Sequence, residues 1–89
     1  MTENGQATHL ARRAMRTLGE LVGCPAEGVT GIRRSDDNWV VIVEVLEVER
    51  VPETSDVMAS YEVEVDGDGE VVGFRRVRRY TRSQTEGVT

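Results

Sequence analysis

The chain has 89 residues, a net charge of −5 and eleven basic residues, all of them arginine. A chain of this length forms one domain, and its acidic balance argues against general binding to nucleic acid, whose phosphates attract net positive charge. The single cysteine excludes an internal disulfide, and no apolar run approaches the roughly 20 residues of a membrane-spanning helix. Residues 1–5 lack the basic and apolar regions of a signal peptide, so we expect a cytoplasmic protein.

The first predicted element is an amphipathic helix that begins near Ala7. Apolar side chains recur there at intervals of three and four residues, at Ala7, Leu10, Ala11, Ala14, Met15, Leu18, Leu21 and Val22. Gly23 and Pro25 predict its end, and Gly19 would allow close approach to a sheet. We expect residues 1–6 to be disordered, residues 7–82 to form a single α+β domain and residues 83–89 to be a disordered tail.

Strand patterns follow the helix. Residues 29–34 predict a short strand, residues 35–38 a polar turn, and residues 39–51 a run too long for one regular strand. The apolar alternation of this run slips by one position near residues 44–46, which predicts a bulge or sharp bend.

The second half of the chain predicts a hairpin. Residues 61–66 alternate cleanly between apolar and acidic side chains, and the aspartate–glycine residues 66–69 are typical of a turn. The pattern of residues 74–82 is compatible with a basic helix or with a bulged strand. The preceding hairpin turn and the β-branched residues Val71 and Val72 favour the strand. The predicted fold is α+β, with one N-terminal amphipathic helix packed on a bent three- or four-stranded antiparallel sheet.

Arginines and aromatic residues are interleaved at the end of this hairpin. The cluster contains Phe74, Arg75, Arg76, Arg78, Arg79, Tyr80 and Arg82. Three interpretations stay open: pairing with glutamates of neighbouring strands, Glu62 and Glu64 among them, a protein-binding patch, or an RNA contact through stacking and phosphate bonds.

Catalytic and metal chemistry have little support in the sequence. His9 is the only histidine, and Cys24 has no histidine near it in the sequence. Asp66, Asp68 and Glu70 have the spacing that begins a calcium loop, but valines occupy its sixth and twelfth positions, so we interpret the segment as a turn. We therefore expect no catalytic residue, no cofactor and no metal.

Several separated motifs occur in a distinctive order. They are Asn38-Trp39-Val40-Val41, Val43-Glu44-Val45, the run Glu49-Arg50-Val51-Pro52-Glu53-Thr54-Ser55-Asp56-Val57-Met58, Tyr61-Glu62-Val63, Asp66-x-x-Gly69-Glu70 and Arg79-Tyr80-x-Arg82. Together they resemble the gas vesicle protein O family over nearly the whole chain and most closely over residues 38–82. Two conservative departures are Glu53 in place of an aspartate and Phe74 in place of a tyrosine.

The resemblance implies a non-enzymatic accessory protein of gas vesicle formation. Such a protein would be an assembly factor or minor vesicle component, located in the cytoplasm or on the vesicle, and would act through contacts with the shell protein or other assembly factors. A homo-oligomer also stays open. The resemblance and the arginine cluster together give a candidate partner-binding surface of Arg50, Pro52, Asp56, Arg75, Arg76, Arg78, Arg79, Tyr80 and Arg82. Trp39 and Tyr61 are expected to belong to the core.

Two other functions remain as alternatives. One is a generic helix-plus-sheet module that binds peptides or acts as an inhibitor, and a well-formed groove between helix and sheet would favour it. An RNA-contacting regulator would need an uncompensated positive surface around residues 75–82.

Overall fold

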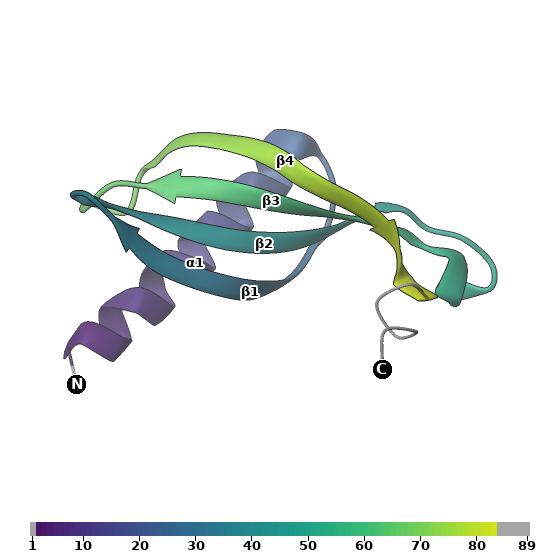
Figure 1. The fold of residues 1–89 in the computed structure, drawn as a ribbon, viewed down its shortest axis with the longest axis horizontal. Helices are drawn as coiled ribbons and strands as arrows, with labels where there is room; N and C mark the ends of the chain where they lie inside the picture. The colour runs from purple at the N-terminus through teal and green to yellow at the C-terminus, as the bar shows by residue number, and fades with distance from the viewer. Residues whose placement is uncertain (1, 84–89) are drawn as a thin grey trace.

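The structure is a computed structural model that describes residues 2–83, with side chains from residue 5 onward. Its elements in chain order are α1 (Thr2–Val22), β1 (Ala26–Ser35), β2 (Asn38–Val48), the short 3-10 helix η1 (Glu53–Ser55), β3 (Val57–Val65) and β4 (Val71–Thr81). The strands form one open antiparallel sheet in the order β1-β2-β3-β4, and α1 crosses one face of it diagonally (Figure 1). The predicted α+β fold is confirmed, and its sheet has four strands.

The boundaries differ in part from those that the sequence predicts. The helix begins at Thr2, so it includes residues 2–6, for which we expected no order. The predicted tail lies outside the described residues except for Ser83. Residues 74–81 belong to strand β4, which confirms the strand interpretation over the helix.

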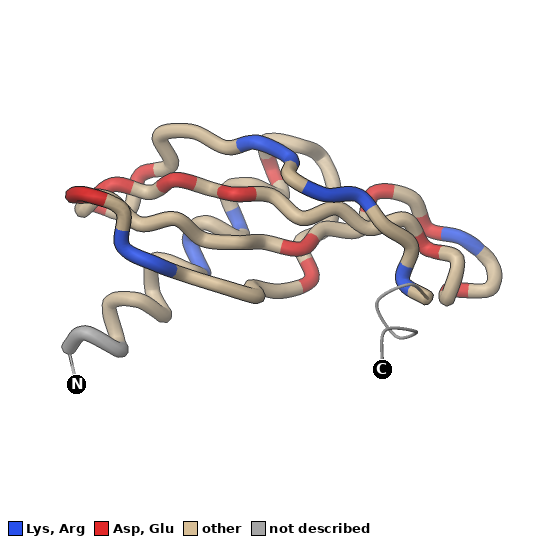
Figure 2. The backbone as a smooth tube through the Cα atoms, in the orientation of Figure 1, with Lys and Arg blue, Asp and Glu red and all other residues tan. Residues whose placement is uncertain are grey.

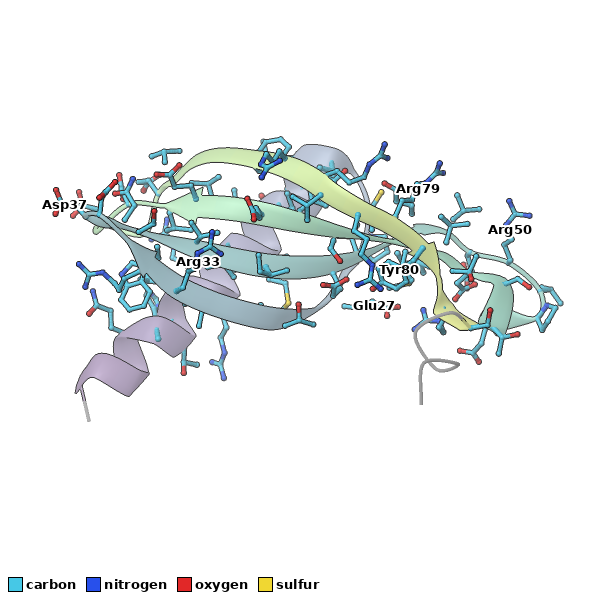
Figure 3. All side chains as sticks on the ribbon, viewed as in Figure 1. Glu27, Arg33, Asp37, Arg50, Arg79 and Tyr80 are labelled. Carbon is cyan, nitrogen blue, oxygen red and sulfur yellow. The ribbon has the colours of Figure 1, made fainter. Side chains whose placement is uncertain are left out.

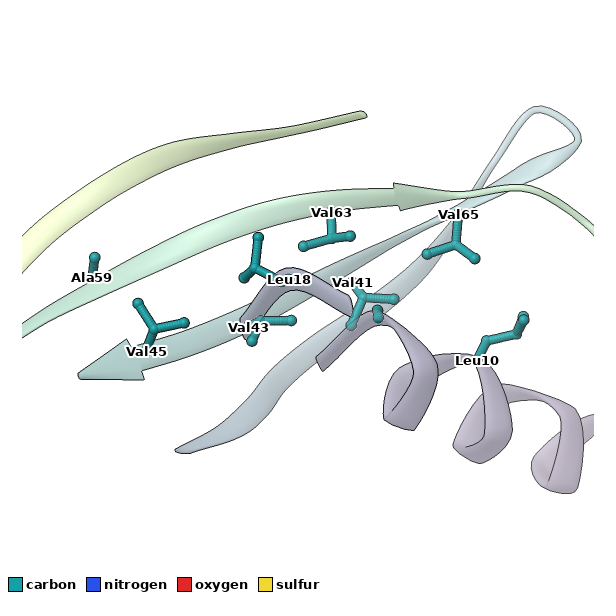
Figure 4. Packing of buried hydrophobic residues seen from close by; sticks show 9 residues of the cluster. Leu10, Leu18, Val41, Val43, Val45, Ala59, Val63 and Val65 are labelled. Atoms are coloured by element: carbon teal, nitrogen blue, oxygen red, sulfur yellow. The ribbon is translucent and has the colours of Figure 1, made fainter. Parts of the chain in front are cut away.

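The core lies between α1 and the middle of the sheet (Figure 4). It consists of small and branched apolar side chains that are almost fully removed from solvent, namely Leu10, Ala14, Leu18, Val41, Val43, Val45, Ala59, Val63 and Val65. Strands turn alternate residues to the same face, and the odd-numbered valines of the core, Val41, Val43 and Val45 of β2 and Val63 and Val65 of β3, therefore point toward α1. Trp39 and Tyr61 pack against this cluster but stay partly exposed.

Two glycines shape the end of the helix. A Cβ atom on Gly19 would lie 3.2 Å from the Cys24 carbonyl oxygen, so any other residue would push the helix and the segment before β1 apart by a few tenths of an ångström. Gly23 has a φ of 71° and donates its N–H to the Gly19 carbonyl at 2.9 Å, which ends the helix in a left-handed cap.

The predicted irregularity in the long second strand is present. Leu46 pairs with Met58 and Val48 pairs with Val57, which leaves Glu47 as an extra residue in β2. This bulge lies just after the predicted position at residues 44–46. It bends the end of β2 and aims the Glu47 carboxylate at the neighbouring arginines of β4.

The turn between β3 and β4 uses its aspartate as a backbone acceptor. Asp66 Oδ1 accepts hydrogen bonds from the N–H groups of Asp68 at 2.9 Å and Glu70 at 3.0 Å. Gly69 adopts a φ of 88° beneath Leu10 and Arg13 of the helix. The segment is therefore organised as a turn, as predicted.

Candidate protein-interaction surface

The residues of the candidate surface lie in two adjoining regions. Four arginines and Tyr80 belong to β4, whereas Arg50 and Pro52 belong to the loop between β2 and β3. The regions meet because Thr81 of β4 pairs with Val57 of β3, which brings Arg82 beside Asp56. Figure 3 shows Arg50 projecting from the far end of the molecule, beyond Arg79 and Tyr80.

Strand β4 is an edge strand with an exposed mixture of apolar and basic side chains. One of its edges pairs with β3, and the other has no strand neighbour among the described residues. Val72, Phe74 and Val77 are 55%, 44% and 41% exposed. The Phe74 ring also packs at an angle against Tyr61, with the ring centroids 6.2 Å apart. Exposed apolar groups thus alternate with arginines along this edge.

The arginines of β4 have partners within the chain. Arg75 lies opposite Glu62 and forms a 3.1 Å ion pair with it, which agrees with the interpretation that arginines of this strand pair with glutamates of a neighbouring strand. Arg76 and Arg79 both reach Glu47, at 3.2 Å and 2.7 Å. Figure 2 shows the basic positions of β4 running beside acidic positions of the neighbouring strand β3.

The remaining contacts correct two details of the predicted pairing. Glu64 lies opposite Gly73 rather than an arginine, and its carboxylate accepts a hydrogen bond from Asn38 at 2.8 Å. Arg78 stacks over the Tyr80 ring, 4.3 Å from its centroid. Sequence patterns did not point to Glu47 as an arginine partner, because its position depends on the bulge.

A half-buried carboxylate organises the sheet face that α1 leaves open. Glu44 accepts hydrogen bonds from the hydroxyl groups of Thr30 at 2.9 Å, Ser60 at 2.6 Å and Tyr80 at 2.5 Å. Burial, and then the hydrogen bond to Glu44, raise the pKa of Tyr80 above its ordinary value. This network joins strands β1 to β4 across the open face and fixes the Tyr80 ring under Arg78.

Asp56 is buried, which differs from the surface position that we expected. It is only 3% exposed, and its carboxylate accepts hydrogen bonds from the Arg50 N–H at 2.7 Å and from the Arg82 guanidinium at 3.1 Å. Arg82 also binds Glu27 at 3.0 Å, and its hydrogen bonds to Glu27 and then Asp56 hold the pKa of Arg82 above its ordinary value. These contacts tie the loop to the ends of β1 and β4.

The loop held by Asp56 presents an apolar tip. Val51 is 99% exposed and Pro52 is exposed beside it. The Ser55 N–H donates to the Pro52 carbonyl at 2.9 Å, so the tip is internally hydrogen-bonded. Arg50 makes no ion pair with any residue that the structure describes, and its guanidinium is available to a partner.

Other chemistry-bearing residues do not join this surface. His9 is exposed on α1, and the half-buried Cys24 thiol lies 3.7 Å from the Val22 carbonyl oxygen. Within residues 2–83, no group of three or more histidine, cysteine, aspartate or glutamate side chains is placed to hold a metal ion. The helix described here has no apolar stretch of the length that a membrane crossing requires.

Comparison with known proteins gives a consistent set of relatives. A family model described as "Gas vesicle synthesis protein GvpO" matches residues 1–86. Gas vesicle protein O of a Streptomyces strain is 51% identical over 75 residues, which cover 84% of this chain and 59% of that protein. Gas vesicle protein O1 of Halobacterium salinarum is 36% identical over 70 residues, which cover 79% of this chain and 59% of that protein.

A third relative has a similar level of sequence identity. Gas vesicle protein O of Haloferax mediterranei is 35% identical over 71 residues, which cover 79% of this chain and 51% of that protein. The chain thus spans between about half and three-fifths of the length of these relatives. No solved structure gave a significant match.

Proposed function

This chain belongs to the gas vesicle protein O family, a family of gas vesicle synthesis proteins with no known catalytic role, and we propose that it is an assembly factor that binds another gas vesicle protein. The partner is the shell protein or a further assembly factor. Binding uses the exposed edge of β4, which we call the β4 patch and define as Val72, Phe74, Arg75, Arg76, Val77, Arg78 and Arg79.

The observation that carries this proposal is the incomplete neutralisation of the arginines. Glu47 is shared by Arg76 and Arg79, and Glu62 lies 3.1 Å from Arg75 and 4.0 Å from Arg33 on β1. Each of these carboxylates therefore faces two guanidinium groups. Positive charge remains at the surface, where planar guanidinium groups can bind further carboxylates in pairs of hydrogen bonds.

The apolar members of the patch supply the other half of a protein interface. More than two-fifths of each apolar residue is exposed, at Val72, Phe74 and Val77. The three neighbouring arginines that form ion pairs, Arg75, Arg76 and Arg79, have side chains that are 49–72% exposed. Aromatic residues and arginine dominate the binding energy of protein interfaces. An acidic partner segment with apolar side chains would bury these groups and supply the missing carboxylates.

The free edge of β4 offers a geometry for this contact. An extended segment can add to an exposed strand edge through main-chain hydrogen bonds, while its side chains meet those of the edge strand. The exposed Val72, Phe74 and Val77 favour this protein contact over the RNA-contacting alternative, and the net charge of −5 opposes general attraction to phosphates.

Replacement of Arg75, Arg76, Arg78 and Arg79 by glutamine tests the proposal. The variant should lose co-purification with its gas vesicle partner, measured by offering each gas vesicle protein of the same organism in turn. Its circular dichroism spectrum should keep its shape, because the core under α1 is untouched, even though the Glu47 carboxylate, whose side chain is only 13% exposed, loses both of its arginine partners.

A control variant carries glutamine at Arg13 and Arg34, which lie outside the β4 patch and do not contact its carboxylates Glu47 and Glu62. It should retain the partner, because it loses charge without losing the patch. Undiminished co-purification of the β4 variant, with its fold intact, would show that the patch is not the docking surface.

A further inference from the structure

A groove runs along α1 on the side that faces β1. Two adjoining hollows of about 670 Å³ and 350 Å³ form it, and both are bordered by Arg12 and Met15. The first extends toward Cys24 and Ala26 at the start of β1. The second extends toward Ile32 and the N-terminal half of the helix. The groove therefore follows most of the length of α1.

The dimensions of the two layers explain why this groove exists. Four strands about 4.8 Å apart make a sheet roughly 19 Å wide, whereas one helix with its side chains is only about 10–12 Å across. Because α1 crosses the sheet diagonally, one helix leaves part of the covered face without a partner (Figure 1). Small residues, Ala7, Ala11 and Gly19, line the helix side of the groove and keep it open.

The floor of the groove is apolar. Val29 of β1 is half-buried and packs against the edge of the core, and Ile32 beside it is 36% exposed. Met15 lies between the two hollows and is only partly buried. A second apolar segment laid along α1 would cover these side chains and complete the layer.

The rim of the groove has a charge pattern of its own. Arg12 and Arg16 are exposed and, within the described part of the chain, neither forms an ion pair. Their neighbour Arg13, in contrast, reaches Glu70 at 3.4 Å on the other flank of the helix. Glu20 lies toward the C-terminal end of the groove. The rim is thus basic over its middle and acidic at one end, in a chain whose net charge is −5.

We infer that this groove is a second docking site, which binds an amphipathic segment of a partner protein with its apolar side chains on the floor and its carboxylates on Arg12 and Arg16. The site is independent of the β4 patch, since β1 and β4 are the two opposite edges of the sheet. A protein with both sites can hold two partners at once, one against each edge.

A synthetic peptide tests this site directly. The probe is a 14-residue helix-forming peptide with leucine at positions i, i+3, i+4 and i+7 and glutamate on the remaining face, and binding is measured by fluorescence anisotropy. The Arg12→Gln/Arg16→Gln variant should bind about tenfold more weakly, since it loses two charge pairs at the rim of an apolar site. Replacing the glutamates of the probe by glutamine should weaken its binding to the wild-type protein by a similar factor.

Two single variants serve as matched comparisons. Arg33→Gln removes a charge from β1 on the face that carries Glu62, and its affinity for the probe should stay within about twofold of the wild type. Glu20→Gln should strengthen binding slightly, because it removes a like charge. Ile32→Asn should weaken binding, because it places a polar side chain on the apolar floor of the groove. The thermal unfolding midpoint of this variant shows whether the fold is retained.

Three outcomes would overturn the inference. One is the absence of saturable binding at millimolar peptide. Another is an equal loss of affinity in the Arg33→Gln and Arg12→Gln/Arg16→Gln variants, which would mean that net charge alone attracts the peptide. The third is concentration-dependent self-association in sedimentation experiments that the Arg12→Gln/Arg16→Gln variant abolishes, which would show that a second copy of this chain occupies the groove.

Discussion

The two faces of the sheet are built from alternate residues of the same strands, yet they hold the molecule together in different ways. Val43 and Val45 point toward α1 and are fully buried. Glu44, which lies between them in the sequence, points to the open face and accepts hydrogen bonds from three hydroxyl groups. One face is held by apolar packing, and the other is held largely by polar contacts that cross from strand to strand.

The difference separates stability from recognition. A fully buried valine or leucine contributes about 1.5–3 kcal/mol, whereas an exposed ion pair contributes about 0–1 kcal/mol. The covered face therefore supplies most of the stability of this small domain. The open face and the β4 edge fix the strand register and leave charged groups that a partner can bind.

The largest effect is expected in the core under the helix. Leu18→Ala removes a fully buried side chain and should lower the free energy of unfolding by about 2–5 kcal/mol, measured by urea denaturation. Leu21→Ala on the same helix, where the side chain is 56% exposed, is the matched control and should cost below about 1 kcal/mol. Equal losses in the two variants would mean that the covered face is not where stability resides.

The next largest effect on stability is expected at Asp56. This residue is an exception to the division between the faces, because here a polar contact is buried and contributes to stability. Asp56→Ala leaves the Arg50 N–H and part of the Arg82 guanidinium without their acceptor and should cost about 2–3 kcal/mol. Glu53→Ala, an exposed position in the same loop, should change the free energy of unfolding by less than about 0.5 kcal/mol. If Asp56→Ala were as mild as the control, the loop would not depend on this buried carboxylate.

A smaller effect is expected in the Glu44 network of the open face. Tyr80→Phe removes one hydrogen bond to Glu44 and should cost about 1 kcal/mol at neutral pH. A double-mutant cycle with Glu44→Gln should show a coupling energy of at least about 0.5 kcal/mol, because the two groups are in direct contact. A coupling energy near zero would mean that the hydroxyl group contributes independently of the carboxylate.

Tyr80 also gives the open face a dependence on alkaline pH. Because folding raises the pKa of Tyr80, the unfolded chain loses the tyrosine proton first once the pH exceeds about 10. The contribution of this residue is therefore fully present below pH 10 and is lost as the pH rises toward the folded pKa. Urea denaturation between pH 9 and 11 should show a steeper decline for the wild type than for Tyr80→Phe.

Much of this arrangement follows from the sequence, because alternation and turn chemistry are local. The acidic and apolar alternation of residues 61–66 predicted β3, and the spacing of apolar residues predicted the buried face of α1. Hairpin pairing suggested that Glu62 could lie opposite an arginine of the last strand, and the structure shows that this arginine is Arg75. These features depend on neighbours in the chain or on a single turn.

The features that sequence patterns did not predict depend on irregular register or long-range assembly. The bulge at Glu47 decides which carboxylate meets Arg76 and Arg79, and its position shows only as a slip in alternation. Asp56 is polar and flanked by loop residues, so its sequence context resembles that of an exposed position. Its burial results from the arrival of Arg82 from the end of β4, 26 residues later.

The smallest effect on stability is expected at Arg75, and it is the sharpest test of the division between the faces. The Arg75 side chain is 72% exposed and its partner Glu62 is 28% exposed, so Arg75→Gln should change the free energy of unfolding by less than about 0.5 kcal/mol. The same change removes one guanidinium from the β4 patch and should still weaken partner co-purification measurably. If Arg75→Gln lowered stability as much as Tyr80→Phe while leaving the partner bound, the arginines of β4 would serve the fold rather than recognition.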